Sequence, residues 1–210
     1  MDIKYPSITI INGNPGSGKS HLTKYLLYSA FCKQSVDYPV IFTNTHGDYE
    51  YIDPKYVNYY SEDRLRQVLA THVSDYKAKH LLLVFDDVLD SVNWNSRLLL
   101  GLITRYRHFF DSRISLIIST QYINKIPPFI RECGSYVVLF KLFTAPSIKA
   151  SYQSYAARFF DNEALWKKYV ESNTGNYYFV FIDNKSQSPN MSDQFKVCKC
   201  PEKLPKFQIS

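Results

Sequence analysis

A glycine-rich stretch near the start of the chain constrains the fold more than any other part of the sequence. Residues 8–11 are all β-branched and predict a buried strand, and residues 17–33 have the pattern of a helix. Between them, Gly13 is followed by four residues and then by Gly18-Lys19-Ser20, which is the spacing of a P-loop. Glycines at these positions let backbone N–H groups converge on an anion. The sequence therefore predicts a nucleotide phosphate site where the first strand ends.

The P-loop pattern assigns roles to its residues. Lys19 is expected to reach the β and γ phosphates, and Ser20 to place its hydroxyl on Mg²⁺. The start of the helix would point the positive end of its dipole at the same phosphates. We therefore expect ATP and Mg²⁺ as cofactors. The predicted nucleotide-binding residues are Gly13, Asn14, Pro15, Gly16, Ser17, Gly18, Lys19, Ser20 and His21.

Two acids end a second apolar run. Residues 80–87 read His-Leu-Leu-Leu-Val-Phe-Asp-Asp, which is typical of a parallel strand buried on both faces. The carboxyl end of such a strand faces the ligand edge of the sheet. Asp86 is placed to hold Mg²⁺, and Asp87 to orient and polarise an attacking water. The alternative is that both acids only cap the next helix.

Further candidate site residues lie downstream. Gln121 follows the apolar run 114–120, and an amide at that strand end could hydrogen-bond both the γ phosphate and the attacking water. Arg107 and Arg131, together with Arg105, are candidates for a guanidinium that neutralises the transition state from a neighbouring subunit. Each arginine could instead be an ordinary surface or ion-pair residue.

Strand and helix patterns alternate along the chain and predict an α/β protein, a P-loop NTPase with a mostly parallel β-sheet and helices on both faces. We predict one P-loop ATPase domain over residues 1–183, with a core of about 7–142 and additional helices and a strand in 143–183. Residues 184–210 are predicted to be a C-terminal polar tail. The remaining expected elements are strands 38–44, 57–60, 136–142 and 177–182, and helices 61–79, 93–110, 127–131, 147–160 and 162–172.

Composition limits the partners and the location. The net charge of +6 favours a polyanionic partner, although the charges are scattered. No run approaches 18 apolar residues and the N-terminus is too polar for a secretion signal, which predicts an intracellular protein without membrane insertion. The four cysteines do not have the spacing of a disulfide framework, and Cys198 and Cys200 form a single Cys-x-Cys, for which reduced thiols are a better interpretation than zinc.

These residues together resemble a known group. Residues 8–142 are similar to the DNA-packaging ATPases of poxviruses, giant viruses, virophages and related tailless viruses, within the FtsK/HerA superfamily. The resemblance rests on the P-loop of residues 13–20, on residues 82–87, on Arg107-His108 followed by residues 114–121, and on Ile-Pro-Pro-Phe-Ile-Arg at 126–131. The sequence departs from the group at Tyr106, where glycine is common, and at Asp87, where cellular members have glutamate.

The resemblance implies a fold of the RecA/ASCE type and an ATP-hydrolysing translocase that packages double-stranded DNA into a preformed capsid. It also implies a homo-oligomeric ring, a pentamer or hexamer, with viral capsid or portal-type proteins as partners. The expected location is the host cytoplasm, the viral factory or the virion. Residues 45–55 and 122–125 are our candidates for loops that face the DNA.

Two other functions remain open. A nucleoside or nucleotide kinase has similar length and the same phosphate loop, but it needs an arginine-rich lid and an acceptor pocket that the sequence does not clearly contain. A non-motor ATP switch that loads or remodels a protein partner is the third interpretation. DNA-stimulated ATP hydrolysis would distinguish the motor from the kinase. A lasting monomer without affinity for DNA would point away from a ring motor and favour the switch.

Overall fold

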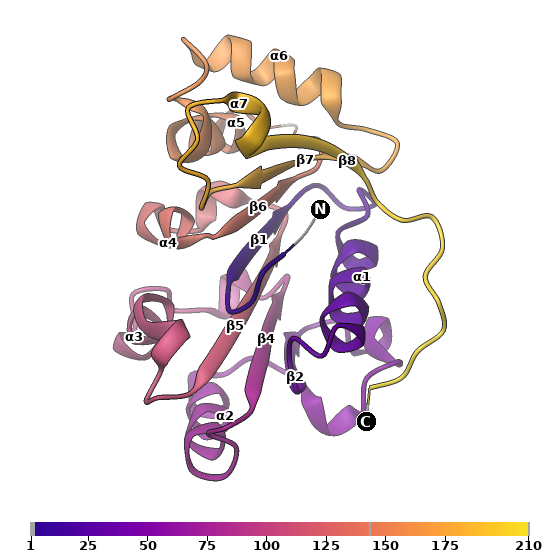
Figure 1. Cartoon of the computed structure of the whole chain (residues 1–210), viewed down its shortest axis with the longest axis vertical. Coiled ribbons are helices and arrows are strands. Elements are labelled where there is room, and N and C mark those ends of the chain that lie inside the picture. The colour runs from indigo at the N-terminus through magenta and orange to yellow at the C-terminus, as the bar shows by residue number, and fades with distance from the viewer. Residues whose placement is uncertain (1–2, 143, 210) are drawn as a thin grey trace.

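The computed structural model describes residues 3–142 and 144–209, which contain one sheet of eight strands (Figure 1). The strand order is β3-β2-β4-β5-β1-β6-β7-β8. The first six strands are mutually parallel, whereas β7 and β8 are antiparallel to their neighbours. The prediction of a mostly parallel sheet is confirmed. The strands are β1 (Ile8–Asn12), β2 (Tyr38–Thr43), β3 (Val57–Asn58), β4 (His80–Asp86), β5 (Arg113–Thr120), β6 (Tyr136–Leu139), β7 (Tyr178–Asp183) and β8 (Phe195–Lys199).

Helices cover both faces of this sheet. On one face, Leu22 and Leu27 of α1 pack in a buried cluster with sheet residues such as Val84. On the other face, Leu65 of α2 and Leu99 of α3 belong to a second cluster. Figure 1 shows α1 on the opposite side of the strands from α2, α3 and α4. The helices are α1 (Lys19–Cys32), α2 (Glu62–Asp75), α3 (Arg97–Arg105), α4 (Pro128–Cys133), α5 (Ala145–Ser151), α6 (Glu163–Asn173) and α7 (Met191–Gln194).

The strand order brings three chain segments together at one edge. Strand β5 lies between β1 and β4, with Asn12 opposite Thr120 and Asp86 opposite Ser119. Because these strands are parallel, the residues that follow each of them meet at the carboxyl edge of the sheet. The fold therefore positions the P-loop next to the segments that follow β4 and β5.

Several predicted elements are longer than the observed ones. The helix expected over 93–110 is divided into α3 and a 3₁₀ turn at Tyr106–His108. The helix expected over 147–160 ends as α5 at Ser151 and continues as a π-helix at Tyr152–Ala156. Strand β6 ends at Leu139 because its pairing with β1 ends there, opposite Asn12. Strand β3 has two residues, although it lies at the sheet edge as expected.

The prediction of a polar tail from residue 184 is wrong for part of that segment. Strand β8 pairs with β7 over Phe195–Lys199 and extends the sheet. After β8 the chain runs along the outer side of α1 (Figure 1), where Phe207 contacts the Tyr28 ring. It then exchanges backbone hydrogen bonds with the 51–53 segment through Ile209. The division of the chain into domains stays a prediction.

Candidate nucleotide site

The P-loop has the backbone geometry that its glycines permit. Gly16 and Gly18 adopt φ angles of 73° and 106°, which side chains rarely tolerate. A Cβ at Gly13 would lie 2.6 Å from the Cβ of Phe140, so this position has no room for a larger residue. A backbone hydrogen bond of 3.2 Å from Ser17 to the Asn14 carbonyl closes the turn. The loop then enters α1, whose N-cap residue Gly18 makes no side-chain cap.

Lys19 lies inside this loop. Its side chain is 7% exposed, and its ammonium donates a hydrogen bond of 3.1 Å to the Asn14 carbonyl. Burial lowers the pKa of Lys19, and the nearby carboxylates of Asp87 and Asp86 act in the opposite direction. A buried ammonium at the start of a helix is suited to bind an anion.

Asp86, which ends β4, is 4% exposed. The Tyr49 hydroxyl donates a hydrogen bond of 2.9 Å to Asp86 Oδ2. Burial raises the pKa of Asp86, whereas this hydrogen bond favours the ionised form. No local sequence pattern points to Tyr49, because it and Asp86 meet only through the fold.

Ser20 and Asp86 offer the oxygen ligands that Mg²⁺ prefers. Ser20 is exposed in the first turn of α1, which follows β1. Asp86 ends β4, which is separated from β1 by β5 alone. The donor set of one hydroxyl and one carboxylate therefore fits magnesium. Tyr49 holds one of the two carboxylate oxygens in place, as the partners that surround metal ligands do.

Asp87 and Gln121 form a direct pair. The Gln121 side-chain amide donates a hydrogen bond of 2.6 Å to Asp87 Oδ2. Asp87 has a φ of 54° and its N–H is bonded to the Ser119 carbonyl at 3.1 Å. This left-handed backbone is uncommon outside glycine and costs free energy, so it is characteristic of functional positions. The exposed Asp87 carboxylate is thereby presented beyond β4.

Two of the three candidate arginines, Arg107 and Arg131, lie away from this edge. Arg107 is exposed, precedes β5, and donates from Nε to the Tyr106 hydroxyl at 3.0 Å. It therefore lies near the amino edge of the sheet, away from the P-loop. Arg131, on α4, is 6% exposed, and its Nε and Nη1 have no hydrogen-bond partner among the described residues.

The ring of His21 points toward the C-terminal segment. Its Nε2 lies 2.5 Å from the Pro201 carbonyl oxygen. Because this contact occupies the ring, the backbone N–H of His21 is the group that remains suited to phosphate binding. We therefore expect His21 to bind phosphate through its backbone N–H and not through its ring.

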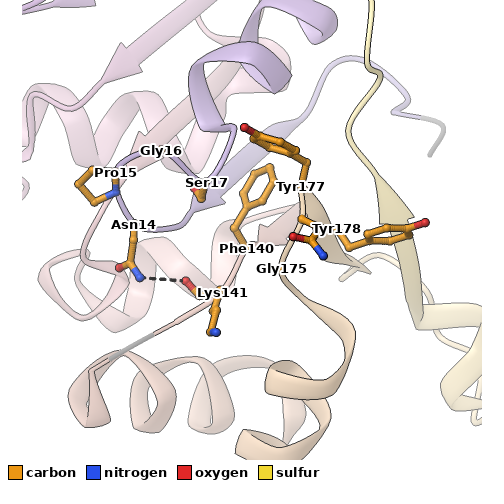
Figure 2. Close-up of a pocket in the computed structure, with 10 residues that line it drawn as sticks. Asn14, Pro15, Gly16, Ser17, Phe140, Lys141, Gly175, Tyr177 and Tyr178 are labelled. Atoms are coloured by element: carbon orange, nitrogen blue, oxygen red, sulfur yellow. Dashed lines mark hydrogen bonds between the residues drawn. The ribbon is translucent and has the colours of Figure 1, made fainter.

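A cavity of about 330 Å³ adjoins the P-loop (Figure 2). One wall is formed by residues 14–17 of the loop, and the other by Phe140 and Lys141 and by the turn at residues 175–178. A side-chain hydrogen bond of 3.3 Å from Asn14 to the Lys141 carbonyl joins the two walls. Sequence patterns do not predict the second wall, because strands β6 and β7 bring it to the P-loop from 120 residues or more along the chain.

With this geometry established, comparisons with known proteins identify the family. Residues 9–131 match the family described as helicase HerA, central domain. The chain belongs to this family. This match confirms the resemblance to the FtsK/HerA superfamily, which the P-loop and the strand-end acids indicated.

Solved structures confirm the P-loop NTPase fold. The genome-packaging NTPase B204 of Sulfolobus turreted icosahedral virus 2, in complex with ATP-γ-S, is 18% identical with a TM-score of 0.70, over 92% of this chain and 96% of that one. The DNA-packaging ATPase B204 of Sulfolobus turreted icosahedral virus is 17% identical with a TM-score of 0.71, over 95% and 100% of the two chains. At these identities the likeness concerns the fold.

Two viral proteins are similar in sequence. Protein 015R of Frog virus 3 is 28% identical over 203 residues, which are 91% of this chain and 61% of that protein. Protein 075L of Invertebrate iridescent virus 6 is 28% identical over 195 residues, 85% of this chain and 70% of that protein. The chain thus spans about three fifths of the length of the first relative. Within the described residues, no helix combines the length and the apolar character that crossing a bilayer requires.

Proposed function

We propose that this protein is an ATP-hydrolysing motor that moves double-stranded DNA into a preformed viral capsid. The observation that carries the proposal is the meeting of three elements at one sheet edge: the P-loop with Lys19, the buried Asp86, and the hydrogen-bonded pair of Asp87 and Gln121. The family match supports an ATP-driven role.

In the proposed reaction, the P-loop backbone and Lys19 hold the triphosphate of ATP. Ser20 and Asp86 would hold Mg²⁺, which supplies charge neutralisation at the phosphates. Asp87 orients a water whose oxygen forms a bond to the γ phosphorus while the bond to the β–γ bridging oxygen breaks. ADP and phosphate leave, and the proton of the water passes through the Asp87 carboxylate.

Gln121 is suited to report the state of the γ phosphate. Its amide donates a hydrogen bond to Asp87, and the same amide could donate to a γ-phosphate oxygen instead. Such an exchange would free the Asp87 carboxylate for water when ATP is present. Binding of the substrate would therefore complete the site.

We further propose that the chain works as a ring of five or six copies around DNA, with Arg107 of one subunit completing the site of the next. Arg107 is the better candidate than Arg131, because it is exposed whereas Arg131 is buried. A ring would repeat the same phosphate contacts several times and would compensate for the modest net charge of one subunit. Viral capsid proteins would be the partners, and infected cells or the virion the location.

The candidate DNA loops share the edge of the ATP site. Residues 45–55 follow β2, and residues 122–125 follow β5. Lys125 lies over the exposed Tyr122 ring and pairs with Asp90 at 2.7 Å. These loops could transmit changes at the γ phosphate to DNA over a short path.

The test is to measure ATP hydrolysis by the purified protein without nucleic acid, with linear duplex DNA, and with nucleosides, and to identify the products. The motor predicts ADP and phosphate at a rate that duplex DNA raises. A phosphorylated nucleoside would instead identify a kinase. Hydrolysis that is unaffected by DNA, from a protein that stays monomeric with ATP, would contradict the motor and favour the ATP switch.

A further inference from the structure

The turn that faces the P-loop has an unusual backbone. Gly175, Asn176 and Tyr177 have φ angles of 123°, 49° and 65°. Glycine accepts such angles freely, asparagine tolerates them, and a tyrosine in this region is a genuine outlier. Strained residues of this kind persist where the surrounding structure holds them, and they are concentrated at ligand sites.

Several contacts hold this turn in place. Strand β7 is antiparallel to β6, with Leu139 opposite Val180, so the turn before β7 lies at the same edge as the P-loop. The Tyr178 N–H donates to the Gly175 carbonyl at 2.8 Å, and the Cys200 N–H donates to the Tyr177 carbonyl at 2.9 Å. Hydrogen bonds within the turn and to the segment after β8 therefore hold the strained backbone in place.

The Tyr177 ring packs beside the start of α1 and remains open to solvent. A Cβ placed on Gly18 would lie 3.1 Å from Tyr177 Cδ1, and 58% of the tyrosine is exposed. Figure 2 shows the Tyr177 ring over the P-loop, whereas the Tyr178 ring points away from it. An exposed aromatic face at this position is available for a flat ligand group.

Space for a ligand extends beyond the P-loop. Asn176 and Tyr177 line the 330 Å³ cavity next to the loop and also a second cavity of about 580 Å³. The second cavity is further lined by His21 and by residues 199–202. His21 directly follows Ser20, so this space begins where the phosphate site ends.

We propose that the Tyr177 ring is the platform on which the base of the bound nucleotide stacks, with a nucleoside triphosphate as the ligand. This inference rests on the proposed function, because it assumes that the P-loop holds the triphosphate. Stacking on an aromatic ring tolerates different bases, since every base has a π-face. The platform thus contributes affinity for the nucleoside and does not itself select among the bases.

The test compares two ligands, ATP and inorganic tripolyphosphate, by titration calorimetry in the presence of magnesium. Tripolyphosphate offers the phosphates without a base. The informative variant is Tyr177→Gly, because glycine accepts the left-handed backbone that the turn requires. Tyr177→Phe keeps the ring, and Tyr59→Ala removes an exposed tyrosine outside both cavities as a matched control.

We expect Tyr177→Gly to weaken ATP binding about tenfold and to leave tripolyphosphate binding unchanged. Tyr177→Phe and Tyr59→Ala are expected to bind both ligands like the unmodified protein. Equal losses for ATP and tripolyphosphate would overturn the proposal, because they would make the ring a support of the loop. Unchanged ATP binding would overturn it as well, and would leave the proposed function intact. Failure of the unmodified protein to bind either ligand would reject the proposed function itself.

Discussion

The two edges of the sheet differ in how their buried polar groups are hydrogen-bonded. At the amino edge, the Ser115 hydroxyl contacts the Ser7 N–H and the His80 ring. The Ser135 hydroxyl accepts from the N–H of Ile8 in β1 and contacts the Tyr106 hydroxyl. At the carboxyl edge, the buried oxygens Asn12 Oδ1 and Ser17 Oγ have no hydrogen-bond partner among the described residues. The amino edge has exceptions, among them the Ser7 hydroxyl and His72 Nε2.

This difference suggests that the amino edge serves stability and the carboxyl edge serves function. Hydrogen bonds made within the chain fix the register of buried strands and contribute to the free energy of unfolding. Polar groups left without partners cost free energy unless a ligand satisfies them. We therefore expect substitutions at the carboxyl edge to alter nucleotide turnover, and substitutions at the amino edge to alter stability.

The largest effect is expected for Lys19→Ala at the carboxyl edge. Loss of the ammonium removes the positive charge that faces the phosphates, so ATP turnover should fall by about a thousandfold or more. The measurement is steady-state phosphate release. Lys167→Ala, which removes an exposed lysine of α6, serves as the control and should leave turnover unchanged. Normal turnover by Lys19→Ala would contradict the assignment of the P-loop.

Asp87→Asn comes next. An amide cannot accept the proton of the attacking water, so hydrolysis should fall by about a hundredfold while ATP remains bound. Binding is followed by calorimetry and hydrolysis by phosphate release. Asp90→Asn changes an exposed neighbouring carboxylate that pairs with Lys125 and is the matched control. Hydrolysis by Asp87→Asn at the unmodified rate would show that another group activates the water.

Tyr49→Phe should have an intermediate effect, on the magnesium requirement of hydrolysis. The substitution removes the hydroxyl that holds Asp86 Oδ2, and loss of a partner of this kind weakens metal binding about tenfold. We expect the magnesium concentration for half-maximal hydrolysis to rise by about that factor. Tyr51→Phe, on the adjacent ring, should not change it. An unaltered magnesium requirement in Tyr49→Phe would remove Tyr49 from the site.

The smallest expected effect is the pH dependence of the free energy of unfolding, which depends on His80 at the amino edge. Burial, together with the nearby Arg113, lowers the pKa of His80 to about 4, below the value of about 6.5 in an unfolded chain. The unfolded state therefore binds a proton that the folded state does not. The contribution of His80 to the free energy of unfolding is therefore fully present above about pH 6.5. It is lost as the pH decreases toward 4, by at most about 1.4 kcal/mol per pH unit.

Urea unfolding at pH 7 and pH 5 measures this dependence. His80→Asn should lower the free energy of unfolding at pH 7, because it breaks the 2.8 Å contact with Ser115, and should make the decrease between the two pH values smaller. His72, whose pKa burial also lowers, would account for part of the remaining decrease. An equal decrease in both proteins would contradict the role given to His80.

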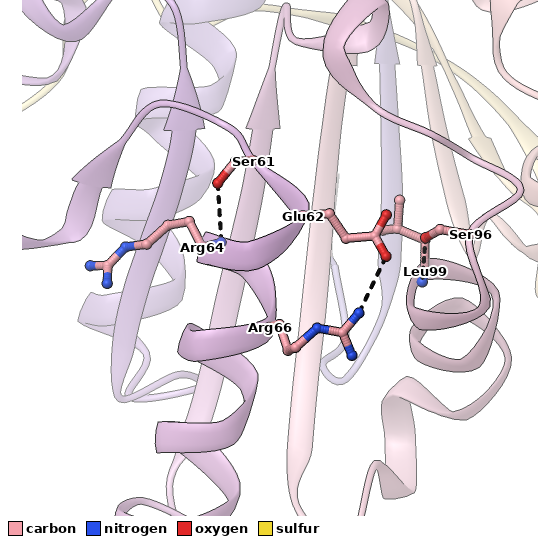
Figure 3. A network of polar contacts seen from close by, with 6 residues as sticks. All are labelled: Ser61, Glu62, Arg64, Arg66, Ser96 and Leu99. Atoms are coloured by element: carbon pink, nitrogen blue, oxygen red, sulfur yellow. Dashed lines mark hydrogen bonds and ion pairs between the residues drawn. The ribbon is translucent and has the colours of Figure 1, made fainter.

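The parts of the site that depend on short segments could be predicted from the sequence. The P-loop follows from the spacing of Gly13, Gly18 and Lys19, and Asp86 follows from the apolar run before it. The start of α2 was also predictable, because Ser61 is a typical cap and its Oγ accepts from the Arg64 N–H (Figure 3). Local chemistry determined each of these features.

Features that depend on distant segments were missed. Tyr49 meets Asp86 and Tyr177 meets Gly18 only after the sheet has formed. Strand β8 buries few side chains at the sheet edge, so its apolar pattern is weak. Helix α3 begins later than the predicted residue 93, because its cap is Ser96, whose hydroxyl accepts from the Leu99 N–H (Figure 3). Ser96 lies in a polar run that hides this cap in the sequence. These errors follow from tertiary contacts and from one unrecognised cap.

The central claim is that the carboxyl edge of the sheet holds ATP. Calorimetric titration of the unmodified protein with ATP and magnesium tests it most directly. We predict binding of one ATP per chain, abolished in Lys19→Ala. Absence of ATP binding at every protein concentration, with or without duplex DNA, would contradict the claim.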